Sequence, residues 1–260
     1  MHNYDVPEAA VFDLDGVITF TARVHAAAWK ELFDNYLRAR SEKLGEPFKP
    51  FDDTSDYQTY VDGKPRYEGV LSFLRSRGIE LPYGSPSDPP DAETICGLGN
   101  RKNDIFNSKV SAMGVDVDQH AVDFVRELRD RNIRVGLASS SKNAAPILER
   151  AGLSDLFEVV VDGKLSELLN LRGKPQPDIF LKCLELLTNR LEPRSAFVVE
   201  DAIAGVEAGH RGGFGLVLGV DRHDQSAALR EHGADWVIRD FREISVESLF
   251  ERFAAQRRVA

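Results

Sequence analysis

The stretch Val11-Phe12-Asp13-Leu14-Asp15-Gly16-Val17 closes the first apolar run of the chain. Its two acids lie two residues apart, so on an extended chain both side chains point to the same side and can enter one site. Two carboxylates held together repel each other unless a cation or a shared proton offsets their charge. A strand end with two solvated acids and a turn glycine gives the same pattern. The stretch therefore predicts a strand but does not by itself decide whether the two acids form a site.

Five later apolar runs have the same character as the first. They are short, β-branched or aromatic, and lack polar alternation, which is typical of parallel strands covered by helices on both faces. The six runs are Ala9–Phe12, Ile133–Ala138, Val159–Val161, Ala196–Val199, Leu216–Leu218 and Trp236–Ile238. Helical patterns lie between them, for example after Asp118 and Asp178. The sequence therefore predicts an α/β fold with a doubly wound, Rossmann-like parallel sheet.

One long region has no strong strand pattern, and helical patterns predominate in it. We expect an inserted all-helical cap domain at residues 23–111, and an α/β core domain formed by residues 1–22 and 112–260. An insert directly after the first strand is expected at the carboxyl ends of the strands, where open α/β sheets bind ligands.

A second acidic pair, Glu200-Asp201, follows the fourth apolar run. Because the ends of parallel strands lie side by side, this pair is expected to meet Asp13 and Asp15. Several carboxylate oxygens gathered in this way suit Mg²⁺. Taken alone, the pair would also fit acids at the start of a helix, where the macrodipole favours them.

Two other segments bring groups that suit an anion. Ser139-Ser140-Ser141-Lys142-Asn143 offers hydroxyls and backbone N–H groups at a helix start, although a simple helix cap has the same residues. Lys174 lies in a proline-containing turn before a helix, where a solvated surface lysine is the alternative. All these segments fall after apolar runs or at helix starts, which favours one shared crevice.

Composition narrows the classes of protein. The net charge of -9 argues against a general nucleic-acid binder, which needs a basic face. The two cysteines, Cys96 and Cys183, lack metal-ligand spacing and fit a reducing cytoplasm. No signal peptide pattern and no bilayer-spanning apolar run is visible. We expect a cytoplasmic monomer with no nucleic-acid or membrane partner.

With these segments in place, the chain resembles the haloacid dehalogenase superfamily, and within it the β-phosphoglucomutase-like branch. The resemblance rests on Asp13-Leu14-Asp15-Gly16-Val17-Ile18-Thr19, Ser139, Lys174-Pro175 and Glu200-Asp201, and it spans nearly the whole chain. The sequence departs from the branch at Phe20, where Asp is frequent before Thr21, and in a long insert between Tyr36 and Tyr67.

The resemblance implies roles for the core residues. Asp13 would attack phosphorus and form an aspartyl-phosphate, and Asp15 would act as general acid and then as general base. Ser139 and Lys174 would hold the phosphoryl oxygens. Mg²⁺ would be bound by Asp13, the backbone carbonyl of Asp15, Glu200 and Asp201.

The resemblance also implies substrate contacts and a reaction class. The substrate-binding residues would be His25, Trp29, Arg66 and Lys102 of the cap, and Thr21, Ser140, Ser141, Lys142 and Asn143 of the core. Hydrolysis of a small sugar phosphate by a phosphatase is the first hypothesis. The alternative is a β-phosphoglucomutase that interconverts β-glucose 1-phosphate and glucose 6-phosphate, and the non-enzyme alternative is a regulatory binding protein on the same scaffold. A metal-free dehalogenase is disfavoured, because it would not need the additional acids.

Overall fold

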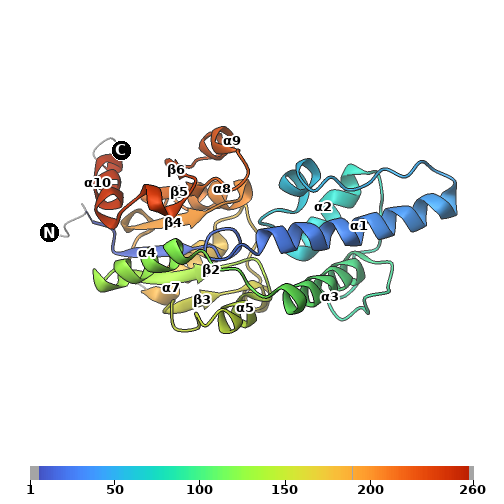
Figure 1. The fold of residues 1–260 in the computed structure, drawn as a ribbon, viewed down its shortest axis with the longest axis horizontal. Coiled ribbons are helices and arrows are strands. Elements are labelled where there is room, and N and C mark those ends of the chain that lie inside the picture. Colours follow the sequence, from blue (N-terminus) through green and yellow to red (C-terminus); the bar gives the residue numbers. More distant parts are fainter. Residues whose placement is uncertain (1–5, 189, 258–260) are drawn as a thin grey trace. The chain divides into compact units, whose positions relative to one another are not determined.

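The computed structural model describes residues 6–188 and 190–257, and its centre is a six-stranded parallel sheet (Figure 1). The strand order is β3-β2-β1-β4-β5-β6. The strands are β1 (Ala9–Phe12), β2 (Arg134–Ala138), β3 (Val159–Val161), β4 (Ala196–Glu200), β5 (Leu216–Val220) and β6 (Trp236–Ile238). The α/β prediction is confirmed, and each of the six expected strands is present with ends that match within one or two residues.

β1 lies in the middle of the sheet and is buried on both faces. It pairs with β2 and β4, so that Phe12 stands beside Leu137 and Val199. Side chains alternate along a strand: Val11 joins the apolar cluster that includes Phe180 of α7, whereas the Phe12 ring packs against Phe197, with ring centroids 6.1 Å apart. Such double coverage explains the unbroken apolar run in the sequence.

Helices lie between the strands, and one more follows the last strand. They are α4 (Gln119–Asp130), α5 (Ala144–Arg150), α6 (Gly163–Leu168), α7 (Asp178–Leu187), α8 (Ile203–Arg211), α9 (Ser226–Glu231) and α10 (Val246–Arg257), with short 3-10 turns at Pro193–Ser195 and Phe241–Glu243. α4 begins where the Asp118 carboxylate accepts hydrogen bonds from the backbone N–H groups of His120 and Ala121. This cap satisfies N–H groups that a helix start leaves without partners.

The chain divides into two compact units. The first comprises residues 1–20 and 116–260, and the second comprises residues 21–115. The chain therefore leaves the first unit after Phe20 and returns to it after Val115, whereas the sequence predicted these boundaries after residues 22 and 111. In the described part of the chain, no helix combines the length and the apolar character needed to cross a membrane.

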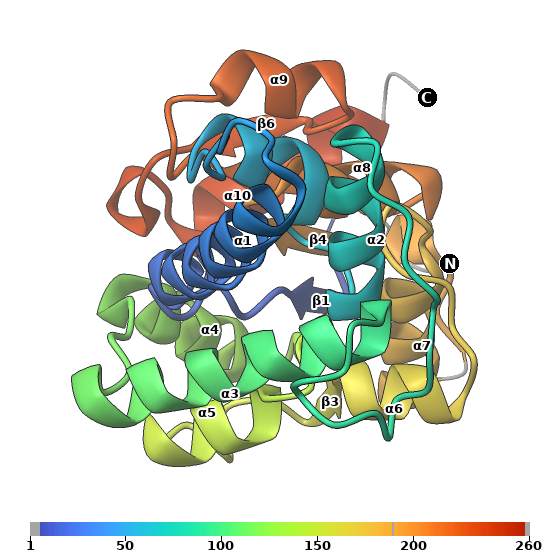
Figure 2. The same cartoon turned by 90° about the vertical axis from the view of Figure 1, so that its right-hand side faces the viewer.

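The second unit is helical (Figure 2). Its elements are α1 (Ala22–Leu44), a π-helical turn (Tyr57–Val61), α2 (Arg66–Ser76) and α3 (Ile95–Met113). α1 and α2 both contact α3. Its core is aromatic: the Phe33 ring lies 4.1 Å from Phe73 and 5.2 Å from Phe51, centroid to centroid. This unit has its own buried cluster, which a separate domain needs.

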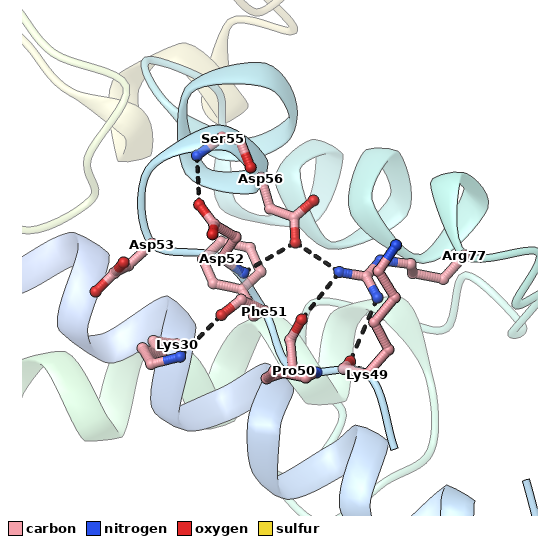
Figure 3. Close-up of a pocket in the computed structure, with 9 residues that line it drawn as sticks. All are labelled: Lys30, Lys49, Pro50, Phe51, Asp52, Asp53, Ser55, Asp56 and Arg77. Atoms are coloured by element: carbon pink, nitrogen blue, oxygen red, sulfur yellow. Dashed lines mark hydrogen bonds and ion pairs between the residues drawn. The ribbon is translucent and has the colours of Figure 1, made fainter. Parts of the chain in front are cut away.

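The long insert between Tyr36 and Tyr67 is fixed to the second unit by Phe51 and by hydrogen bonds around it (Figure 3). Lys30 Nζ donates to Phe51 O over 2.8 Å, and the Arg77 guanidinium donates to Pro50 O over 3.1 Å and to the Asp56 carboxylate over 2.6 Å. The side chains border a surface hollow of about 440 Å³. In this hollow Lys30 and Arg77 bind groups of the insert itself, so these two contacts hold the insert in place.

Candidate active site

Asp13 and Lys174 meet at the carboxyl end of β1. Asp13 directly follows the strand, and its backbone N–H donates to Val199 O of β4 over 2.9 Å. Lys174 precedes α7 in the chain, yet its Nζ donates to Asp13 Oδ1 over 2.6 Å. Both side chains are buried, at 6% and 1% exposure. The Lys174 ammonium also lies 4.8 Å from the centre of the Phe180 ring, a favourable cation–π position.

Glu200 holds Lys174 from the other side. It is the last residue of β4, and its Oε1 accepts a hydrogen bond from Lys174 Nζ. Its Oε2 accepts the backbone N–H of Ala202 over 2.8 Å. Gly205 makes room for this carboxyl group, because a Cβ at that position would overlap it. Both oxygens of Glu200 thus have protein partners, and the acid acts on Lys174.

The electrostatics of this pair follow from burial. Removal from water disfavours the carboxylate and raises the pKa of Asp13 to about 8; the Lys174 ammonium opposes the rise, while the Glu200 and Asp15 charges add to it. Burial alone would lower the pKa of Lys174, but Asp13 and Glu200 hold it above its usual value. Lys174 is therefore protonated, and the site carries more acid than one ammonium offsets.

The turn that carries Asp15 is tightly fixed. Gly16 adopts a φ of 83°, which favours glycine, and its N–H donates to Thr19 O over 2.7 Å. A Cβ on Gly16 would overlap the carboxylate of Asp201, so this acid lies directly against the turn. Asp201 is itself buried. The structure thus gathers Asp13, Asp15, Glu200 and Asp201 around the ends of β1 and β4.

Ser139 lies at the end of the neighbouring strand β2. It is buried, and its Oγ accepts the backbone N–H of Ser141 over 3.1 Å. The Ser141 Oγ in turn accepts the N–H of Asn143 over 3.2 Å, so the segment forms a compact turn before α5. Lys142 Nζ forms an ion pair with Glu167 over 2.7 Å. Ser140 is part of the same turn, and its carbonyl approaches Gly163.

In the second unit, three of the expected substrate-binding residues lie together. Lys102 Nζ is 2.5 Å from His25 Nδ1, and the His25 ring stacks on Phe106 with centroids 4.0 Å apart. Lys102 Nζ also lies 4.9 Å from the centre of the Trp29 ring. Trp29 is buried and stacks on Phe33, so it belongs to the core of this unit as well.

The other two expected residues of this unit are Thr21, which contacts His25 through its backbone, and Arg66. Thr21, buried at the start of α1, accepts the N–H of His25 at its carbonyl. Arg66 begins α2, and its guanidinium carbon lies 6.0 Å from the centre of the Tyr67 ring.

The donor set fits a hard divalent cation by its chemistry. Asp13, Asp15 and Asp201 supply carboxylate or backbone oxygens, the ligands that Mg²⁺ prefers together with water and phosphate. Burial of Asp13 beside two further acids leaves an excess of negative charge that such a cation would offset. No group of three or more His, Cys, Asp or Glu side chains capable of holding a metal by themselves occurs in residues 6–188 and 190–257. Such a cation would also take backbone oxygens and water as ligands.

Two features of this site were not anticipated from the sequence. One is the contact of Glu200 with Lys174, which joins residues 26 positions apart. The other is the loop after β5, residues 221–225, which reaches the Asp15 turn through Arg222. The signal for this loop was a run of polar residues directly after an apolar run, the same pattern that marks Asp13 and Glu200.

The chain as a whole is similar to known proteins. A family model for haloacid dehalogenase-like hydrolases matches residues 7–213. The chain is 46% identical to a β-phosphoglucomutase of Mycobacterium bovis, over 91% of this chain and 90% of the relative. It is 28% identical to a phosphorylated carbohydrates phosphatase of Thermotoga maritima, over 87% and 92% of the two chains. A solved β-phosphoglucomutase from Clostridium difficile superposes with a TM-score of 0.77 at 26% identity, covering 98% of this chain and 100% of that one.

Proposed function

The chain belongs to the haloacid dehalogenase-like hydrolase family and is an enzyme, a phosphatase or a phosphomutase, and we propose that of these two it is a β-phosphoglucomutase. The observation that carries this choice is the 46% identity to a β-phosphoglucomutase over nine tenths of both chains. The substrate pair would be β-glucose 1-phosphate and glucose 6-phosphate. This choice reverses the order of the two hypotheses that the sequence alone suggested.

The buried Asp13–Lys174 contact supports a covalent mechanism. Lys174, at 2.6 Å, holds the Asp13 carboxyl in one orientation. An Asp13 oxygen attacks phosphorus, the bond from phosphorus to the leaving oxygen breaks, and Asp15 gives that oxygen a proton. The 6-hydroxyl of β-glucose 1-phosphate then attacks this aspartyl-phosphate and gives its proton to Asp15, which forms glucose 1,6-bisphosphate. After the bisphosphate turns round, Asp13 attacks its 1-phosphate, Asp15 protonates the leaving oxygen, and glucose 6-phosphate is released with the aspartyl-phosphate restored.

The other core residues bind and orient the phosphoryl group in this proposal. Lys174 contributes a positioned positive charge where charge develops in the transition state, and the hydroxyl of Ser139 contributes a hydrogen bond. Asp13, Asp201 and the backbone carbonyl of Asp15 would hold Mg²⁺, with Glu200 positioning Lys174. When bound, Mg²⁺ would neutralise the repulsion between the carboxylate and the phosphate.

The cap residues support a sugar phosphate as the substrate class. Lys102 is buried beside the His25 ring, and Arg66 adds a guanidinium suited to a second phosphate. A bisphosphorylated intermediate requires two such anion-binding groups. The two cysteines, both buried, also fit our further proposal that the protein works in the cytoplasm, and we expect it to act as a monomer.

Product analysis tests this proposal. The enzyme with Mg²⁺ is given β-glucose 1-phosphate and a trace of glucose 1,6-bisphosphate, and phosphorus NMR follows the products. A mutase converts the substrate to glucose 6-phosphate with little inorganic phosphate. The α-anomer and the Asp13→Asn variant serve as controls, and both should give no product.

A phosphatase is the second candidate, and the relationship to the Thermotoga carbohydrate phosphatase favours it. In that case water takes the place of the sugar hydroxyl at the aspartyl-phosphate. Inorganic phosphate as the main product of the same NMR experiment would reject the mutase in favour of this candidate.

A further inference from the structure

The loop between β5 and α9, residues 221–225, reaches from the neighbouring strand end to the turn that carries Asp15. Arg222 is its long cationic residue. Its Nε donates to Gly16 O over 2.7 Å, and the same guanidinium lies 3.5 Å from Val17 O. One side chain thus contacts two successive carbonyls directly after Asp15.

The Arg222 guanidinium is also anchored by Asp118. One terminal nitrogen donates to Asp118 Oδ2 over 2.6 Å, and both side chains are largely buried, at 13% and 4% exposure. Asp118 is itself fixed, because its Oδ1 caps α4 and its N–H donates to Ile18 O over 2.9 Å. A buried, hydrogen-bonded arginine–carboxylate pair of this kind holds a defined geometry.

Arg222 also contacts the end of the first unit. Its guanidinium carbon lies 5.0 Å from the centre of the Phe20 ring, and Phe20 is the residue after which the chain leaves this unit. The backbone N–H of Phe20 donates to Asp116 O, where the chain returns. The arginine therefore contacts the catalytic turn, a helix cap and the chain crossing together.

The loop that presents Arg222 is held by Asp221. The Oδ1 atom of Asp221 accepts the backbone N–H groups of His223 and Gln225, and its Oδ2 accepts the Ser226 hydroxyl. Gln225 Nε2 in turn donates to the carbonyl of Asp201 over 3.3 Å. The loop thus supports both acidic segments, through Arg222 at the Asp15 turn and through Gln225 at Asp201.

We propose that Arg222 is a positioning residue that fixes the Asp15 turn, so that the Asp15 carboxyl is aimed at the leaving oxygen of the substrate. The proposal rests on the assignment of Asp15 as general acid. A misplaced general acid slows proton transfer even when the nucleophile and the phosphate-binding groups are intact. The role is therefore specific to substrates whose leaving group needs a proton.

A comparison of leaving groups tests this role. The kcat/KM for β-glucose 1-phosphate, whose sugar oxygen needs a proton, is compared with that for p-nitrophenyl phosphate, whose leaving anion is stable without one. For the sugar phosphate, kcat/KM includes phosphoryl transfer to the sugar hydroxyl and back to Asp13, and Asp15 moves the proton of the sugar oxygen in both transfers. Arg222→Met should lower it about 10- to 100-fold for the sugar phosphate and less than about threefold for the aryl phosphate. The kcat/KM of Arg222→Lys for the sugar phosphate should lie between those of wild type and Arg222→Met, because lysine keeps the charge but not the fork of donors.

Arg211→Met is the matched control, because Arg211 pairs with Glu207 on the exposed side of α8. It should leave both kcat/KM values unchanged. Equal losses for both phosphates in Arg222→Met and Arg222→Lys would overturn the positioning role.

Amide hydrogen exchange gives a readout that needs no turnover. Exchange at residues 14–19 should be faster in Arg222→Lys and Arg222→Met than in Arg211→Met, and unchanged exchange there would reject the proposal. Failure of the wild-type enzyme to turn over either phosphate would instead contradict the proposed function, and the exchange measurement would still decide the role of Arg222.

Discussion

Replacement of Lys174 by methionine removes the ammonium that contacts both Asp13 and Glu200. Methionine keeps much of the length and apolar volume of the side chain, so the change isolates the charge. Two buried acids, at 6% and 1% exposure, then lose their common cation. Breaking a buried ion pair from one side costs about 3–5 kcal/mol, because the remaining charge stays buried. Against a total stability of about 5–15 kcal/mol, the variant should fold but unfold more easily.

The same change should affect catalysis separately. Loss of one positioned donor in a dry site lowers kcat about 10²- to 10³-fold. Urea unfolding without Mg²⁺ measures the stability effect, and turnover of β-glucose 1-phosphate with Mg²⁺ measures the catalytic effect. Lys182→Met is the control, because Lys182 pairs with Glu185, which is 60% exposed, and such surface pairs contribute about 0–1 kcal/mol.

The double variant Lys174→Met/Glu200→Gln separates the two effects. It removes one buried negative charge together with the cation, so it should regain part of the lost stability while turnover stays low. The reasoning is refuted if Lys174→Met resembles Lys182→Met, with a stability loss below about 1 kcal/mol and a kcat change below about threefold.

Three further predictions concern Asp13, the metal and Asp221. Asp13→Asn should fold and yet show no turnover, since an amide is not a useful nucleophile; near-normal turnover of the folded variant would contradict the covalent mechanism. Chelation of Mg²⁺ with EDTA should abolish turnover and re-addition should restore it, and an undiminished rate would reject the metal. Burial alone would raise the pKa of Asp221, but the Ser226 hydroxyl and two backbone N–H groups hold it below its usual value of 3.8. A lowered folded-state pKa stabilises the fold above the unfolded-state pKa. Wild type should therefore be more stable than Asp221→Asn at pH 7, and this difference should shrink as the pH falls below about 4; a difference independent of pH would refute that origin.

The six strands, and the acids that end two of them, can be predicted from the sequence. Strands such as Ala196–Glu200 are recognisable in the sequence because a central parallel strand is apolar on both faces, a property that each segment carries locally. The helical character of the insert is predicted by its periodicity, but the helix ends are not: α1 runs to Leu44 and α3 begins at Ile95. Helix ends depend on caps such as Thr94, whose pattern is short and common.

The contacts between the site residues depend on the tertiary structure. Lys174 and Asp13 are 161 residues apart, and nothing in either local pattern states that one donates to the other. The sequence predicts Glu200 as a metal ligand, and the fold adds that one of its oxygens accepts a hydrogen bond from Lys174 and the other from Ala202. In the sequence Arg222 is an ordinary polar loop residue. The order of β1, β4 and β5 in the sheet brings its loop to Gly16. Periodicity and spacing describe neighbours along the chain, while the contacts of a site are set by strands paired across the sheet.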